Sequence, residues 1–272
     1  MLVAHLSDPH LVTVAESPRP GAALRRAFDR MLALDPRPDQ VVLTGDLADH
    51  GQPAEYEALR VILDAVPLPV LLATGNHDDR AALLAVFAGT DHLAGTDTTH
   101  YVVESAESTL AVLDSLVPGE PGGRLGPGQL SWLDGALDRR PGVPAFVVVH
   151  HPPVDLGMPF LDSIRLADGD ALAAVVAAHP NVVRVLSGHV HRQVTTAFAG
   201  TVLTTASSTF LQTALLTSSG RPPGYVAEPP SFLLHLLTGT TCVTHTVLLP
   251  PPPRRLRWPP ATTPGATLGL DA

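Results

Sequence analysis

The sequence predicts an α/β fold in which two mixed sheets pack face to face with helices outside, and three observations lead to it. Short apolar runs alternate with helical patterns along much of the chain, as in α/β proteins. Hairpin patterns interrupt this alternation, so antiparallel strands must join the parallel ones. The 272-residue chain is 45% hydrophobic, which is enough to build a substantial core.

Five short apolar runs end in small or polar residues and are predicted to be buried strands. They cover residues 1–7, 40–45, 69–75, 145–151 and 182–188. Helical patterns lie between them, over residues 21–34, 54–66, 128–140 and 169–179. Two hairpins are expected over 100–113 and 193–206, the second turning at Gly200, and residues 231–249 add two more strands. Parallel and antiparallel pairing should therefore coexist.

The chain contains no internal repeat and no clear domain boundary before Pro250. From that residue onward the sequence is rich in proline and has no periodicity, which is typical of a tail. We therefore expect one domain over residues 1–249 and a proline-rich tail over 250–272.

Composition excludes several classes of protein. The net charge of −9 gives no basic face for nucleic acid, apart from a short run at Arg254–Arg257. No run approaches the roughly 18 apolar residues needed to cross a membrane, and the N-terminus does not resemble a secretion signal. Cys242 is the single cysteine, so neither an intramolecular disulfide nor a thiolate metal cluster can form. We expect a cytoplasmic protein.

Metal-ligating residue types follow each of the five predicted strands. In open α/β sheets the loops beyond the carboxyl ends of the strands hold the ligand site. The residues that stand at these positions, in strand order, are Asp8 and His10, then Asp46, then Asn76 and His77, then His150 and His151, and finally His189 and His191.

Each of these fragments has an ordinary structural explanation when it is taken alone. A glycine–aspartate pair can cap a helix, a glycine–asparagine pair can form a turn, and adjacent histidines commonly divide between core and surface. The pair His189 and His191 is the most specific, because alternating residues can point to the same side. Agreement of all five fragments at strand ends, which we expect in the same sheet, predicts a metal site.

The donors indicate which metals the site would bind. They provide imidazole nitrogen together with carboxylate or amide oxygen, without sulfur, and they are too numerous for one tetrahedral ion. This set favours a pair of divalent first-row ions, Mn, Fe, Zn or Co, with one carboxylate bridging them. The seven predicted ligands are Asp8, His10, Asp46, Asn76, His150, His189 and His191.

The order Asp-x-His, Gly-Asp, Gly-Asn-His-Asp, His-His and Gly-His-x-His resembles the calcineurin-like metallophosphoesterases. Within them the chain is most similar to bacterial class III cyclic nucleotide phosphodiesterases and glycerophosphodiesterases, from Leu2 to about Leu249. The resemblance implies a four-layer α/β/β/α sandwich, a homodimer or higher homo-oligomer, and a catalytic domain with two metals. One metal would be bound by Asp8, His10 and His191, the other by Asn76, His150 and His189, and Asp46 would bridge both.

The resemblance also implies an activity. Such an enzyme would be a metal-dependent phosphoric diester hydrolase that attacks small phosphodiesters, 3′,5′-cyclic nucleotides or glycerophosphodiesters, with a metal-bridging hydroxide. Asp46 and Asn76 would act through the metals, while His77 would face the substrate phosphate or the leaving-group oxygen. A phosphomonoesterase, a nuclease or a non-catalytic scaffold of the same fold remains an alternative.

The residues leave three further points open. His151 either supports its neighbour or touches substrate. Asp78 either orients His77 or caps the helix that starts near Arg80. Substrate choice should depend on the loops over residues 114–127, 155–168 and 207–230, which are rich in proline, glycine and serine.

Overall fold

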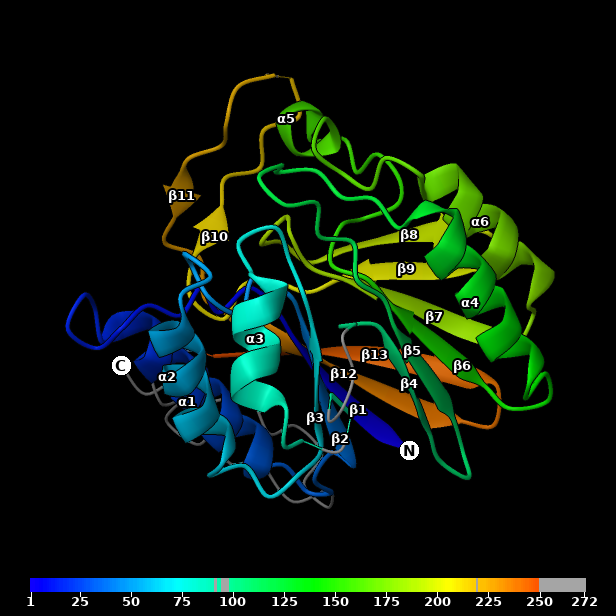
Figure 1. The fold of residues 1–272 in the computed structure, drawn as a ribbon, viewed down its shortest axis with the longest axis horizontal. Helices are drawn as coiled ribbons and strands as arrows, with labels where there is room; N and C mark the ends of the chain where they lie inside the picture. Colours follow the sequence, from blue (N-terminus) through cyan, green and yellow to red (C-terminus); the bar gives the residue numbers. More distant parts are fainter. Residues whose placement is uncertain (91, 94–97, 219, 250–272) are drawn as a thin grey trace, which may run out of the picture.

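Two mixed β-sheets lie face to face with helices on their outer sides, as Figure 1 shows for a computed structural model of the chain. The structure describes residues 1–90, 92–93, 98–218 and 220–249. The predicted fold class is therefore confirmed. The predicted tail, residues 250–272, lies outside the described residues.

The first sheet has five strands in the order β13-β12-β1-β2-β3. β1, β2 and β3 are parallel, whereas β12 and β13 form an antiparallel hairpin whose first strand pairs with β1. Their bounds are Leu2–Leu6 for β1, Gln40–Thr44 for β2, Val70–Ala73 for β3, Ser231–Thr238 for β12 and Thr241–Leu248 for β13.

The second sheet has six strands in the order β4-β5-β6-β7-β9-β8. β5, β6, β7 and β9 are parallel, and the two edge strands β4 and β8 are antiparallel to their neighbours. The bounds are Tyr101–Glu104 for β4, Thr109–Val112 for β5, Ala145–Val148 for β6, Val182–Ser187 for β7, Val194–Phe198 for β8 and Thr201–Thr205 for β9. Both predicted hairpins form.

In the described part of the chain, five helices of eight or more residues flank the sheets. α1, α2 and α3 cover the first sheet, and α4 and α6 cover the second (Figure 1). Their bounds are Arg19–Leu32 for α1, Pro53–Leu63 for α2, Arg80–Phe87 for α3, Gly126–Asp138 for α4 and Gly169–Ala178 for α6. α1 begins two residues earlier than predicted, because Pro20 fits the first turn of a helix, where no backbone donor is needed.

Two short elements fall in segments that were expected to be loops. The helix α5 covers Pro159–Asp162, and a two-stranded ribbon pairs β10, Gln212–Thr213, with β11, Tyr225–Val226. They lack a sequence signal because each is too short to show periodicity.

Alternating residues of β6 divide the core into two parts. Phe146 and Val148 pack between the sheets, whereas Val147 and Val149, in and just after the strand, pack under α4 and α6. A strand buried on both faces must be apolar throughout, which explains why this segment reads as a continuous hydrophobic run. Burial of a side chain such as Phe146 contributes about 1.5–3 kcal/mol.

Asp114, just after β5, connects the two sheets through a buried carboxylate. It accepts hydrogen bonds from Thr74 Oγ1 (2.8 Å), Thr99 Oγ1 (2.5 Å) and the Arg80 guanidinium (Nη2, 2.9 Å). Burial opposes ionisation of this carboxyl, but the Arg80 and threonine hydrogen bonds outweigh it and lower its pKa. The charged form is therefore built into the fold.

We expect Asp114→Asn to lower the free energy of unfolding at pH 7 by about 1–2 kcal/mol, since Arg80 is partly exposed and the ion pair is screened. A lowered folded-state pKa stabilises the protein above the unfolded carboxyl pKa of about 3.9, and that contribution disappears as the pH falls below it. The difference in urea midpoint from wild type should thus shrink at acid pH.

The matched control for this substitution is Asp155→Asn, because Asp155 pairs with Arg165 but is 69% exposed. We expect it to change stability by less than about 0.5 kcal/mol. Equal losses in the two variants at pH 7 would contradict the structural role of Asp114.

Candidate metal centre

The seven predicted ligands come together where the carboxyl ends of strands from both sheets meet. Three of the loops follow β1, β2 and β3 of the first sheet, and two follow β6 and β7 of the second. The expectation of a single sheet is therefore wrong. The parallel strands of both sheets end at the same side of the sandwich, so the loops of each sheet supply part of one site.

The backbone is in a sparsely populated conformation at five of these residues. Positive φ angles occur at Asp8 (49°), His10 (44°), Asp46 (47°), His189 (69°) and His191 (51°). Among the described residues, one other non-glycine residue, in the β8–β9 turn, shares this property. Such conformations cost about 1–3 kcal/mol each and cluster at functional sites. The strain therefore marks these loops as a site rather than as ordinary turns.

Two glycines allow the loops to approach closely. A Cβ at Gly45 would lie 2.4 Å from His150 Nδ1, and one at Gly188 would lie 2.0 Å from Ser7 Oγ. Gly45 also has a φ of 94°. The glycines before Asp46 and His189 thus have a steric reason, because any side chain would displace a predicted ligand or its support.

One group of ligand atoms comprises Asp8, His10, Asp46 and His191. His10 Nε2 lies 3.0 Å from His191 Nε2 and 3.5 Å from Asp46 Oδ2, and His191 Nε2 lies 3.5 Å from Asp8 Oδ1. Donors bound to one first-row ion at about 2.0–2.1 Å stand about 3–3.5 Å apart. The spacing therefore suits a single ion.

The proton positions of the two imidazoles support this. His10 Nδ1–H donates to the Asp49 carboxylate (2.8 Å), and His191 Nδ1–H donates to the Leu211 carbonyl (2.8 Å). When both rings are neutral, each directs an unprotonated Nε2 toward the other. Burial opposes protonation of His10, but the Asp49 hydrogen bond and the neighbouring carboxylates of the site outweigh it and raise the pKa of His10, so a cation between the rings is favoured. Two facing lone pairs repel one another unless a cation lies between them, and such partners on Nδ1 are what metal-ligating histidines have.

A second group comprises Asn76, His150, His189 and again Asp46. Asn76 Oδ1 lies 3.2 Å from His150 Nε2 and 3.0 Å from His189 Nδ1, and His150 Nε2 lies 3.4 Å from Asp46 Oδ2. His150 Nδ1–H donates to the Thr44 carbonyl at 2.6 Å. Asp46 Oδ2 therefore belongs to both groups, and the residues fit a pair of ions that share this carboxylate.

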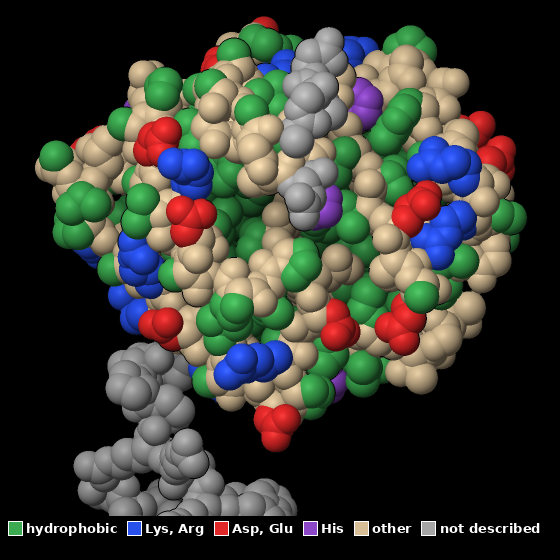
Figure 2. All heavy atoms as spheres, turned by 60° about the horizontal axis from the view of Figure 1, so that its bottom comes forward, with side chains coloured by type: hydrophobic (Ala, Val, Ile, Leu, Met, Phe, Trp, Pro, Cys, Tyr) green, Lys and Arg blue, Asp and Glu red, His purple; other side chains and the backbone are tan. Residues whose placement is uncertain are grey.

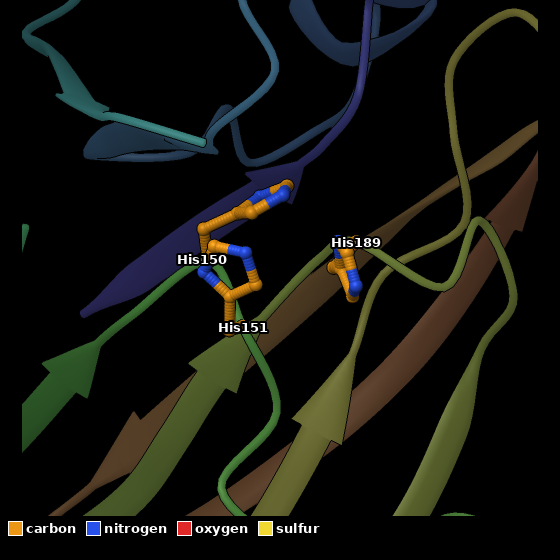
Figure 3. A group of neighbouring side chains, drawn as sticks. All are labelled: His150, His151 and His189. Carbon is orange, nitrogen blue, oxygen red and sulfur yellow. The ribbon is translucent and has the colours of Figure 1, made fainter. Parts of the chain in front are cut away.

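His151 lies beside the second group but has partners of its own. Figure 3 shows that the rings of His150 and His151 turn in different directions, with His189 on the neighbouring segment. His151 Nδ1 lies 2.8 Å from Ser115 Oγ, and its Nε2 lies 3.2 Å from the Pro121 carbonyl. The side chain is fully buried. Of the two predicted roles, this position favours support of its neighbour over contact with substrate.

The electric field of the site favours a cation. Burial disfavours the charged forms of both Asp46 and His150, but their mutual attraction outweighs it. It holds the pKa of Asp46 well below its usual range and, with Asp8, raises the pKa of His150 to about 9. Burial and the neighbouring imidazoles lower the pKa of His189 well below its usual range. His189 thus stays neutral, whereas a metal ion at His150 must displace the proton that the neighbouring carboxylates favour.

His77 lies at the edge of the centre, in a pocket of about 390 Å³ that Asp49, Asn76 and Glu120 also line. Its side chain is 41% exposed. The Nδ1–H donates to the Asp49 carbonyl (2.8 Å), and the backbone N–H donates to Asp46 Oδ1 (2.9 Å). These bonds fix the imidazole beside the ligands and leave Nε2 available to a bound substrate.

Asp49 was not predicted to take part in the site. Its carboxylate accepts from His10 Nδ1 and lies 3.7 Å from His77 Nδ1. The hydrogen bond from His10 is the main cause that lowers the pKa of Asp49. In the sequence, Asp49 is marked only by its position three residues after Asp46, in the same loop. The histidines that Asp49 contacts are visible only in the fold.

Both roles predicted for Asp78 are wrong, because this residue neither orients His77 nor caps the following helix. Asp79 caps α3, accepting from Ala82 N at 2.8 Å. The buried Asp78 carboxylate instead accepts from the backbone N–H groups of Leu47, Ala48 and Gly75, at 3.1, 3.0 and 2.8 Å. Burial, followed by repulsion from Asp46, raises its pKa to about 6. Asp78 thus holds two ligand-bearing loops together.

The family model of the calcineurin-like phosphoesterases matches residues 1–193 of the chain. The chain belongs to this family. It is 32% identical to the glycerophosphodiester phosphodiesterase GpdQ of Enterobacter lignolyticus over 251 residues, which cover 90% of both chains. It is also 32% identical, over 261 residues, to a probable cyclic nucleotide phosphodiesterase of Rhodococcus erythropolis, covering 90% of this chain and 82% of that protein.

A solved structure of the same fold comes from an animal. The dimetal phosphatase LOC 393393 of Danio rerio superposes with a TM-score of 0.65, at 19% identity, over 92% of this chain and 99% of that one. The similarity shows that the two chains share the sandwich fold. Every helix in the described residues is too short or too polar to cross a lipid bilayer.

Proposed function

We propose that this calcineurin-like phosphoesterase is a binuclear metal-dependent phosphodiesterase that hydrolyses small phosphodiesters. The observation that carries the proposal is the arrangement of seven donors in two groups that share Asp46 Oδ2. The names of its relatives, a glycerophosphodiester phosphodiesterase and a probable cyclic nucleotide phosphodiesterase, support the substrate class.

The charges of the ligands suit an anionic substrate. When bound, two divalent ions supply a water of pKa about 7 as nucleophile and stabilise charge on the phosphoryl oxygens. Asp8 and Asp46 together cancel about half of the formal charge that the ions bring. Asn76 contributes a neutral oxygen, so the centre keeps the positive charge that attracts a phosphodiester, where an aspartate would remove it.

His77 is the residue of the chain that we assign to the leaving group. Because Nδ1–H is held by the Asp49 carbonyl, a neutral ring has no proton on Nε2. Donation to a leaving alkoxide therefore requires the imidazolium, whose Nδ1 lies 3.7 Å from the Asp49 carboxylate. The donated proton is the one on Nε2.

His77→Ala should lower kcat for an alkyl diester such as glycerophosphocholine by about 10²- to 10⁴-fold, because an alkoxide leaves poorly without a proton. Bis(4-nitrophenyl) phosphate has an activated leaving group, so kcat for this substrate should fall by less than about tenfold. Steady-state kinetics on both substrates measure the difference. His50→Ala removes another exposed imidazole from the same pocket and is the control. Equal losses on the two substrates would remove the acid role.

The overall proposal is tested with metal-quantified protein and a panel of substrates. We expect turnover of 3′,5′-cyclic nucleotides or glycerophosphodiesters that disappears on metal removal and returns on reloading with Mn, Fe, Zn or Co. A higher kcat/KM for a phosphomonoester would favour a phosphomonoesterase. Activity on DNA alone would favour a nuclease, and metal binding without turnover of any substrate would favour a scaffold.

Three further parts of the proposal concern nucleic acid, cellular location and oligomeric state. Nucleic acid is disfavoured as substrate by the net charge of −9, and acidic and basic side chains are interspersed on the face in Figure 2. We propose a cytoplasmic location from the single cysteine, Cys242. We propose a homodimer or higher homo-oligomer from the family resemblance, which a solution mass measurement tests.

A further inference from the structure

An exposed aromatic ring stands beside the metal centre. Tyr225, on β11, is 63% exposed, although apolar and aromatic side chains of this size are usually buried. Its ring centroid lies 6.2 Å from that of the predicted ligand His191, with 30° between the ring planes. The tyrosine ring therefore lies against the His191 ring, and much of it remains open to solvent.

The ribbon that carries Tyr225 is attached to the ligand-bearing loop. Thr213 on β10 pairs with Tyr225, and its hydroxyl donates to the Val190 carbonyl at 2.7 Å. Arg192 Nη1 donates to the Thr213 carbonyl at 2.6 Å and pairs with Glu228 at 3.1 Å. Residues on both sides of His191 thus bind the ribbon, so the distance between Tyr225 and the metal ligand is set by the fold.

The phenol also lies close enough to the carboxylates of the site for them to affect its pKa. Partial burial, and then the carboxylates of Asp49, Asp46 and Asp8, raise the pKa of Tyr225. The exposed part of the ring, which lies beside the predicted ligand His191, presents a π surface for stacking. A planar group that extends from a phosphate at the metal centre would meet this face.

We propose that Tyr225 is a specificity-determining residue that stacks on the base of a nucleoside 3′,5′-cyclic phosphate bound at the metal centre. This inference rests on the proposed function and narrows its substrate class. A base has the flat π surface that an aromatic side chain recognises, whereas the glycerol and headgroup of a glycerophosphodiester have none. The chain's acidic balance favours a single nucleotide over a polynucleotide.

The test compares Tyr225→Ala and Tyr225→Phe with wild type on 3′,5′-cyclic AMP and on glycerophosphocholine. Loss of base stacking should raise KM for cyclic AMP in the alanine variant by at least about 5-fold. Its kcat, and both constants for glycerophosphocholine, should stay within about twofold of wild type. The phenylalanine variant keeps the ring and should behave as wild type on both substrates.

Leu215→Ala is the matched control, since it removes another exposed apolar side chain, 58% exposed, next to β10. This variant should have the KM and kcat of wild type on both substrates. Equal losses of the alanine variant on both substrates would mean that Tyr225 only supports the ribbon. A phenylalanine variant as impaired as the alanine variant would show that the hydroxyl matters, not stacking. Either result, or an unchanged KM for cyclic AMP, overturns the proposal.

Binding measurements separate this inference from the proposed function. Calorimetry on the metal-loaded protein compares 5′-AMP with glycerol 3-phosphate, which has a similar phosphate but no base. Tyr225→Ala should weaken the binding of 5′-AMP by at least about 5-fold and leave the affinity for glycerol 3-phosphate unchanged. If wild type hydrolysed neither diester, the proposed function would fail, and this comparison would still decide whether Tyr225 recognises a base.

Discussion

Replacing His191 or His189 with alanine should empty different metal positions and abolish diesterase activity, with losses of at least about 10³-fold. The structure places His191 Nε2 with His10 and Asp8, and His189 Nδ1 with Asn76. Removing either ring deletes one donor from one group and leaves the other group intact. Metal titration followed by mass spectrometry should therefore show the loss of a different affinity class in each variant.

The second member of each group provides an independent check on this result. His10→Ala should lose the same affinity class as His191→Ala, and Asn76→Ala the same class as His189→Ala. His179→Ala is the control, because His179, at the end of α6, is equally buried but pairs with Asp134 on α4. The two-group arrangement would be wrong if His189→Ala and His191→Ala lost the same class, or if metal-free protein kept its activity.

Asp78→Asn should damage stability and activity together. The Asp78 carboxylate accepts from three backbone N–H groups and from the Tyr56 hydroxyl (2.9 Å). An asparagine in its place has one acceptor oxygen and directs an NH₂ group at donors that are already buried. Because unsatisfied buried donors cost about 1–3 kcal/mol each, we expect the free energy of unfolding to fall by about 2–4 kcal/mol.

Urea unfolding measures the loss of stability, and metal content with turnover measures its effect on the site. The loops of Asp46 and Asn76 should loosen together, so metal affinity should fall even in the fraction that remains folded. Asp79→Asn is a close control, since Asp79 is exposed and asparagine caps a helix as well as aspartate does. A variant of Asp78 with unchanged stability and metal affinity would contradict this role.

The strands and the positions of the ligands could be predicted from the sequence because their causes are local. A strand covered on both faces must be apolar, so the five parallel runs stand out, and the residue after each run begins a loop at the carboxyl end. The order of donors along these ends then indicates a metal site, and glycine before Asp46 and His189 signals a tight turn. Such features need only a few neighbouring residues to be recognised.

The tertiary structure alone decided how these residues meet. It assigned β6 and β7 to the second sheet, whose loops meet those of the first. The backbone N–H of His189 can therefore donate to the Asp8 carboxylate although 181 residues separate them. The tertiary structure also placed Asp49 against His10, Asp78 under two loops, and Tyr225 beside His191. These contacts depend on long-range packing of segments without periodicity of their own, and therefore leave no pattern in the sequence.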